Sequence, residues 1–187
     1  MRPLNASITA ATLLAAAFAA QAEDPTEPPQ LAGTIYETAA ASYGVAPRML
    51  YGVTLQETQR MRSPTRVSPW PWALRTPDGG QWFDSRRAAA AALEDALARW
   101  SLYEIDVGLG QINLGWHEDR YDSPTELLDP QRNLQISAAI LSEALASTDD
   151  PALGVGRYHT WSDEERARRY GASVLSIIHR ISLLGRQ

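Results

Sequence analysis

The chain of 187 residues contains no cysteine, and this absence excludes two structural options. Without cysteine there is no disulfide framework and no attachment point for a lipid. The folded protein must therefore rely on an apolar core. Residues 23–187 suffice for one domain with such a core, which would bury roughly two-thirds of the surface of the unfolded chain.

Positive charge and long apolar runs are also scarce. The chain has 17 basic and 22 acidic side chains, for a formal net charge of −5. Nucleic acids bind clustered basic side chains, whereas the arginines here are scattered, so the composition argues against a nucleic-acid partner. After the N-terminal segment no apolar run is long enough for a membrane helix, and no internal repeat is visible.

The N-terminus has the pattern of an export signal. Arg2 precedes an alanine-rich apolar run over residues 8–20, and Ala20-Gln21-Ala22 fits an A-x-A cleavage site. The mature protein is then expected in the periplasm, without a stable membrane anchor. The predicted parts of the chain are a signal peptide over 1–22, a proline- and acid-rich linker over 23–30 and one domain over 31–187.

Apolar residues recur at helical spacing over most of this domain. Around the turn signal Pro77-Asp78-Gly79-Gly80, residues 72–75 and 81–83 can pair as a β-hairpin. Residues 105–113 look turn-like with a little strand. The fold class is predicted to be mainly α with a small β-hairpin beside a cleft. Helices are predicted over 31–43, 47–59, 84–102, 124–128, from 129 to about 145, over 151–158, and from a capping box at Ser162 onward.

Glu57 is the most informative residue of the predicted domain. Leu50 and Val53 lie seven and four residues before it, so the three side chains share one helix face. A carboxylate on an apolar face is costly unless it is paired or used. Such a setting raises the pKa of a glutamic acid, which can then donate a proton near neutral pH. The alternative is a helix-end acid paired with Arg60 or Arg62.

A glycine-rich turn follows about fifty residues later. Gly108-Leu109-Gly110-Gln111-Ile112-Asn113 carries two amides, and with Glu57 it suggests an acid catalyst facing a sugar-sized cleft. Asp106 could be the second carboxylate that many glycosidases use, or a hydrogen-bonded brace of this turn. A single glutamate suffices where the substrate supplies its own nucleophile, as the 6-hydroxyl of N-acetylmuramic acid can.

Aromatic and histidine residues give weaker signals. Three tryptophans in a proline-rich segment could wall the cleft and stack on sugar faces: Trp70, Trp72 and Trp82. Trp116 and Trp161 belong to no sequence pattern that predicts their positions in the fold. The three histidines form no metal-binding spacing, so neither a metal nor a cofactor is expected.

The order of four motifs resembles the soluble lytic transglycosylase domain, a family with the goose-type lysozyme fold. The resemblance extends over about Ile35 to Ile181. The proline- and tryptophan-rich segment is similar to the members that accompany conjugation and type IV secretion systems. The motifs are Leu55-Gln56-Glu57-Thr58, the glycine-rich turn, Arg157-Tyr158-His159, and Tyr170 with Val174.

This resemblance implies an activity and a set of site residues. The activity is cleavage of peptidoglycan glycan strands between N-acetylmuramic acid and N-acetylglucosamine, with 1,6-anhydromuramic ends as products. Secretion or conjugation components are implied partners, for which the cut would open the wall locally. Glu57 matches the catalytic acid. The positions that match substrate-binding residues are Thr58, Gly108, Leu109, Gln111, Asn113, Tyr158, His159 and Tyr170.

Three positions depart from the usual family pattern. Thr58 stands in place of serine and keeps a hydroxyl, Gly110 replaces methionine and implies a more open sugar subsite, and His159 replaces asparagine. Two other functions are left open by the sequence. One is a hydrolytic, lysozyme-like muramidase that uses Asp106 or a held water. The other is a non-catalytic peptidoglycan-binding or assembly factor.

Overall fold

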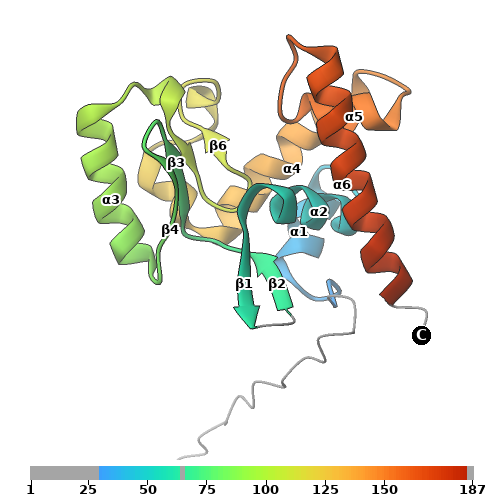
Figure 1. Cartoon of the computed structure of the whole chain (residues 1–187), viewed down its shortest axis with the longest axis horizontal. Helices are drawn as coiled ribbons and strands as arrows, with labels where there is room; N and C mark the ends of the chain where they lie inside the picture. The colour runs from blue at the N-terminus through green and yellow to red at the C-terminus, as the bar shows by residue number, and fades with distance from the viewer. Residues whose placement is uncertain (1–29, 64–65, 185–187) are drawn as a thin grey trace, which may run out of the picture.

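A group of helices and a small sheet form the two halves of the molecule (Figure 1). The structure is a computed structural model that describes residues 30–63 and 66–184. The predicted signal peptide and linker, up to residue 29, lie outside the described residues. The mainly α fold class is confirmed, with a small antiparallel sheet beside the helices.

Prolines and capping residues mark the starts of helices in the helical half of the molecule. Pro47, Pro130 and Pro151 occupy first-turn positions, where their fixed φ suits a helix and their missing N–H is not needed. Asp129 and Asp150 accept hydrogen bonds from the first-turn backbone. The helices of this half are α1 (Ile35–Ser42), α2 (Pro47–Thr58), α4 (Pro130–Ala146), α5 (Pro151–Arg157) and α6 (Glu164–Leu184).

Two predicted helix starts were wrong. The first helix begins at Ile35 rather than at residue 31, because Thr34 has the extended backbone of an N-cap (φ −97°, ψ 169°). The last helix is capped by Asp163, whose carboxylate accepts from the Arg166 backbone N–H at 2.9 Å. Ser162 was predicted for this role, but its hydroxyl pairs with that of Thr160.

The other half holds the sheet and a third long helix. Four short antiparallel strands lie in the order β4-β3-β5-β6, and the predicted hairpin is confirmed as β3 and β4. Helix α3 ends at residue 99 rather than 102, because Ser101 caps a separate 3-10 turn. The elements are β3 (Ala73–Thr76), β4 (Gly79–Trp82), α3 (Arg86–Arg99), η1 (Leu102–Glu104), β5 (Asp106–Val107), β6 (Ile112–Asn113), η2 (Glu118–Arg120) and η3 (Pro124–Leu128).

A two-stranded ribbon between the halves was not predicted. Strand β1 (Gln59–Ser63) continues directly from α2 and pairs antiparallel with β2 (Arg66–Pro69). The prolines of this segment conceal the strand pattern in the sequence. The ribbon turns the chain away from the end of α2, so that Glu57 lies at the junction of helix and ribbon.

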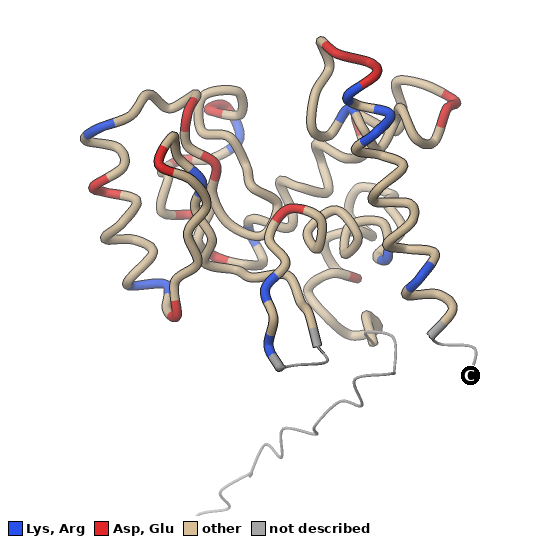
Figure 2. Tube along the Cα trace, in the orientation of Figure 1, with Lys and Arg blue, Asp and Glu red and all other residues tan. Residues whose placement is uncertain are grey.

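Each half has its own apolar core. Leu93, Ile105 and Leu128 are fully buried in the sheet half, and Leu50 and Leu141 in the helical half. Partly buried Tyr158 packs against both cores. Figure 2 shows the basic positions spread over both halves rather than gathered on one element. Over residues 30–63 and 66–184, no helix is both long and apolar enough to cross a membrane.

Candidate active site

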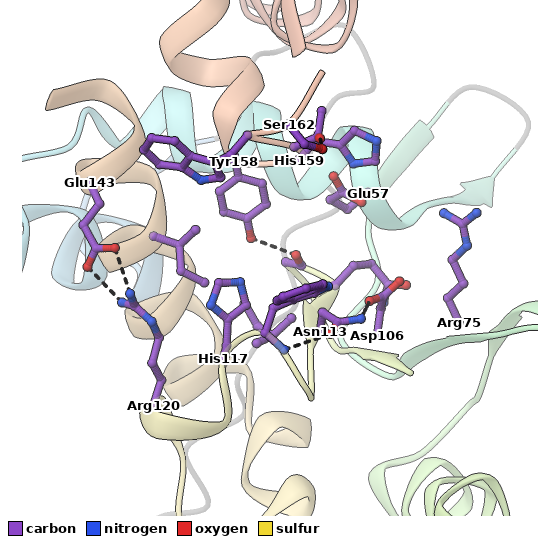
Figure 3. Close-up of a pocket in the computed structure, with 17 residues that line it drawn as sticks. Glu57, Arg75, Asp106, Asn113, His117, Arg120, Glu143, Tyr158, His159 and Ser162 are labelled. Carbon is purple, nitrogen blue, oxygen red and sulfur yellow. Dashed lines mark hydrogen bonds and ion pairs between the residues drawn. The ribbon is translucent and has the colours of Figure 1, made fainter. Parts of the chain in front are cut away.

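A cavity of about 720 Å³ lies where the two halves meet. Figure 3 shows one wall formed by the α5–α6 connection, with Tyr158 and His159, and the facing wall formed by the sheet half, with Asp106, Asn113 and His117. Glu57 projects into it from the end of α2. The cavity therefore brings together side chains from Glu57 to Ser162, which are far apart in the sequence.

Glu57 is held by a tyrosine and not by an arginine. The Tyr170 hydroxyl donates to Glu57 Oε1 at 2.5 Å. Arg60 instead pairs with Asp84 at 3.0 Å, and Arg62 bonds the Ser68 hydroxyl. The pairing of Glu57 with either arginine is thus not the arrangement in the structure.

Burial raises the pKa of the Glu57 carboxyl from 4.5 to about 7. The hydrogen bond from Tyr170 lowers it, the negative charge of Asp106 raises it, and the positive charge of Arg75 lowers it by a smaller amount. The raised pKa expected from the apolar helix face is confirmed. A pKa in this range leaves both the protonated and the charged form of Glu57 accessible near neutral pH, so the group can both donate and accept a proton.

His159 and Tyr170 form a stacked pair beside this carboxyl. Their ring centroids lie 4.9 Å apart, and the planes differ by only 7°. Partial burial and the positive charges of Arg166 and Arg75 lower the pKa of His159, so the imidazole is largely uncharged at neutral pH. Burial raises the pKa of Tyr170, which keeps its proton on the phenol as a donor to Glu57.

The glycine-rich turn is fastened by a buried asparagine that the sequence analysis missed. Asn133 on α4 is fully buried. Its Oδ1 accepts from the Gly110 N–H at 2.8 Å, and its Nδ2 donates to the carbonyls of Val107 and Leu127, both at 2.9 Å. A polar residue on the buried face of a helix was the only sequence signal for this role, since buried polar groups need partners.

The backbone of this turn has two residues in the left-handed region. Gly108 has φ 80°, and a Cβ there would lie 2.2 Å from Asn133 Nδ2. Gln111 has φ 48°, a conformation costly for a residue with a side chain. Its Nε2 donates to the Gly108 carbonyl at 2.9 Å, so the side chain braces the turn from which it projects into the cavity.

Gly110 does not open a subsite, contrary to the expectation from the family pattern. A Cβ at this position would lie 2.0 Å from Ser137 Oγ and 2.5 Å from the Tyr158 hydroxyl. The Tyr158 hydroxyl donates to the Gly110 carbonyl at 2.7 Å. The space beside Gly110 is therefore filled by α4 and Tyr158.

Asn113 lines the cavity, but its amide is fully used by the protein. Its Nδ2 donates to Asp106 Oδ1 at 2.8 Å and to the Tyr103 carbonyl at 2.9 Å. Its Oδ1 accepts from the backbone N–H groups of Gly115 and Trp116, both at 3.1 Å. Asp106 thus braces this segment as the sequence allowed, while it also faces the cavity. Burial raises its pKa.

Thr58 and Leu109 lie behind the cavity. They are only 1% and 4% exposed. The Thr58 hydroxyl is within hydrogen-bonding distance of the Leu109 carbonyl, at 3.2 Å, and accepts from the Trp70 N–H. Their contact with substrate stays a prediction; in the structure they fasten the end of α2 to the glycine-rich turn.

The two tryptophans that line the cavity are those whose positions in the fold the sequence did not predict. Trp116 is 74% exposed and Trp161 57% exposed, and both line the cavity. Tyr103 supports the Trp116 ring edge-on at 4.9 Å, and the Arg157 guanidinium lies over the Trp161 ring. The expected cleft tryptophans do not line this cavity: Trp70, Trp72 and Trp82.

Further charged residues of the cavity come from segments with no motif. Arg120 and Glu143 form a two-bonded ion pair at 3.0 and 2.8 Å, at the end of the cavity away from Arg75 (Figure 3). His117 lies near them, and burial lowers its pKa. Nothing in the sequence marks these residues, because their partners are distant along the chain.

No metal site is apparent in this part of the molecule. Within residues 30–63 and 66–184 there is no group of three or more histidine, aspartate or glutamate side chains placed to hold a metal ion.

Comparison with known proteins identifies no family. No protein-family model, no curated protein and no solved structure matches the chain.

Proposed function

We propose that this protein is an exported peptidoglycan lytic transglycosylase with a lysozyme-like fold of the goose type. The observation that carries the proposal is the Glu57 carboxyl, held by Tyr170 in a cavity large enough for a sugar chain and with a pKa of about 7. The exposed rings of Trp116 and Trp161 at the same cavity support a carbohydrate ligand, because aromatic faces pack well on the apolar faces of sugars.

In the proposed reaction Glu57 acts twice. Its proton passes to the oxygen that links N-acetylmuramic acid to N-acetylglucosamine, and the bond from this oxygen to the muramic anomeric carbon breaks. The muramic 6-hydroxyl then bonds to that carbon and returns its proton to the Glu57 carboxylate. The product is a 1,6-anhydromuramic end, no water is consumed, and the enzyme returns to its starting state.

The proposed setting is the periplasm, where the protein would cut the wall locally for a conjugation or secretion apparatus. The support for this setting is the N-terminal signal pattern and the proline- and tryptophan-rich segment. Recruitment by such an apparatus would confine the cutting to one place.

A hydrolytic muramidase is the second candidate, and one observation favours it. Asp106 faces the same cavity as Glu57, and its charge raises the Glu57 pKa. Two carboxyl groups on one cavity are the arrangement used for attack by water or by a carboxylate nucleophile. The bond from Asn113 to Asp106 favours a bracing role and therefore the first candidate.

Product analysis by mass spectrometry decides between these candidates. Purified wall sacculi digested with the protein should release muropeptides that end in the anhydro ring. Products heavier by one water would establish hydrolysis, and loss of activity in Asp106→Asn would then assign the second carboxylate. A protein that sediments with sacculi and releases nothing soluble would be a non-catalytic binding factor, and both enzymatic candidates would fall.

A further inference from the structure

One arginine of the cavity lacks an anionic partner among the described residues. Arg75 lies on β3, exposed, and lines the cavity. No hydrogen bond or ion pair of its guanidinium is found within the described ranges. The other arginine of the cavity, Arg120, has its charge paired with Glu143 through two hydrogen bonds, while its Nε–H has no partner among the described residues. The cavity thus has one arginine in an ion pair and one whose N–H donors are available to a ligand, although the charge of Arg75 also acts on Glu57 and Asp106.

Arg75 has an acidic neighbour across the sheet, but its side chain forms no hydrogen bond with it. Asp106 is its cross-strand partner in the register of β3 and β5, and side chains opposite each other in antiparallel strands share a face. Asp106 is bonded through Oδ1 to Asn113. Burial raises the Asp106 pKa, and the charge of Arg75 acts to lower it without a hydrogen bond between the two side chains. Figure 3 shows the guanidinium directed away from β3, at the end of the cavity where Glu57 and Asp106 lie.

A planar guanidinium has five N–H donors in a fork that matches a carboxylate. Because Arg75 is exposed in the cavity, a ligand carboxylate can reach it without burying an unpaired charge. Bonds between two charged groups of this geometry are stronger than bonds between neutral groups.

We propose that Arg75 binds a carboxylate carried by the glycan substrate, so that the cavity selects anionic over neutral amino-sugar chains. This inference rests on the proposed function. On a peptidoglycan strand the carboxylate could be the lactyl group of a muramic acid without its peptide, or a free carboxylate of the stem peptide. The recognition chemistry is the same for both.

The test compares three ligands in a background that cannot cleave them. Binding of the Glu57→Gln protein is measured by calorimetry with neutral N-acetylglucosamine oligomers, with glycan strands stripped of peptide, and with strands that keep it. Adding Arg75→Gln should weaken binding of a carboxylate-bearing ligand about tenfold and change binding of the neutral oligomer less than about twofold. The stripped and intact strands show which carboxylate Arg75 contacts.

Two further variants separate recognition from a general charge effect. Arg75→Lys keeps the charge but not the fork, and should restore only part of the lost affinity. Arg87→Gln removes an exposed arginine of α3 outside the cavity and should change no affinity. Raising salt from about 0.05 to 0.5 M should weaken binding of the anionic ligands to the Arg75 protein more than to the Arg75→Gln protein.

The outcomes distinguish this inference from the proposed function. Equal weakening of neutral and anionic ligands by Arg75→Gln, no weakening, or no binding of any glycan would overturn it. Wild-type protein that releases anhydro products with no such discrimination would leave the proposed function standing and remove only the role of Arg75. If Arg75 discriminates between the ligands but the protein releases nothing from sacculi, the role of Arg75 would stand and the proposed function would be contradicted.

Discussion

The two walls of the cavity differ in how their polar groups are satisfied. On the helical side, burial raises the pKa of Glu57 to about 7, and its hydrogen bond comes from Tyr170. On the sheet side, Asn113 makes four hydrogen bonds to the protein and Asp106 is tied to it. Under the proposed function the helical wall would carry out the proton transfer, and the sheet wall would hold a fixed shape.

This difference separates chemistry from recognition. Proton donation needs a group in a poorly solvated setting, where its charged and neutral forms have similar free energies. Recognition of a long ligand needs rigid side chains with exposed ends, and Arg75 and Trp116 extend from such a framework. Substitutions at the proton-transfer group and at the exposed cavity side chains should therefore change different kinetic parameters.

The largest effect is expected at Glu57 itself. Glu57→Gln keeps the size and the acceptor for the Tyr170 hydroxyl but has no proton to transfer, so kcat on purified glycan strands should fall about a thousandfold while glycan binding persists. The matched control is Glu94→Gln, an exposed position on α3, which should behave as the wild type. Turnover retained in Glu57→Gln would place the proton donor elsewhere.

Breaking the support of the sheet wall should cost stability. Asn133→Ala leaves the Gly110 N–H and the carbonyls of Val107 and Leu127 without their side-chain partner, with an expected loss of about 3–5 kcal/mol in the free energy of unfolding. Urea titration measures it. Ser137→Ala on the same helix removes one buried hydroxyl and should cost about 1 kcal/mol; equal losses would contradict the special role of Asn133.

The pH dependence of stability tests whether the Glu57 carboxyl is buried away from solvent. A carboxyl whose folded-state pKa is raised to about 7 favours folding at low pH and disfavours it as pH rises through that value. Glu57→Gln removes this cost, so its stability relative to wild type should increase by up to about 3 kcal/mol between pH 5 and pH 9. Urea titrations at the two pH values measure the difference. A constant difference would mean that Glu57 is well solvated.

Removal of the Tyr170 hydroxyl should shift the pH profile of activity. The hydrogen bond from Tyr170 lowers the Glu57 pKa, so Tyr170→Phe should move the alkaline limb of kcat/KM to higher pH and reduce kcat about tenfold through looser positioning. The stacked aromatic contact with His159 is kept. Tyr36→Phe is the control, because it removes a hydroxyl bonded to Thr54 of α2. If the alkaline limb of kcat/KM stays unchanged, a group other than Glu57 sets this pH dependence.

The smallest effects are expected from the exposed rings. Trp116→Ala and Trp161→Ala should each raise KM about fivefold with kcat within about twofold, because stacking contributes about 1 kcal/mol. Trp82→Ala removes an exposed ring outside the cavity and should leave KM unchanged. A change confined to kcat would place the rings in the chemical step and remove the division between chemistry and recognition.

The sequence predicted local features well and the cavity only in part. The start of α2 at Pro47, the hairpin around Pro77-Asp78 and the elevated pKa of Glu57 all follow from signals within a few residues. The β1–β2 ribbon was missed because prolines outweighed a weak alternation. Gly110 was misjudged because its neighbours, Ser137 and Tyr158, belong to other elements.

By itself the sequence determined that this chain forms capped helices with a carboxyl on an apolar face, since helix periodicity and capping act over one or two turns. Only the tertiary structure decided which polar groups form hydrogen bonds within the protein and which remain available to a ligand. Arg120 pairs with Glu143 and Asn133 bonds the glycine-rich turn, whereas the Arg75 guanidinium has no hydrogen bond or ion pair within residues 30–63 and 66–184. The physical reason is that a hydrogen bond needs atoms within about 3 Å, and between distant segments packing alone sets that distance.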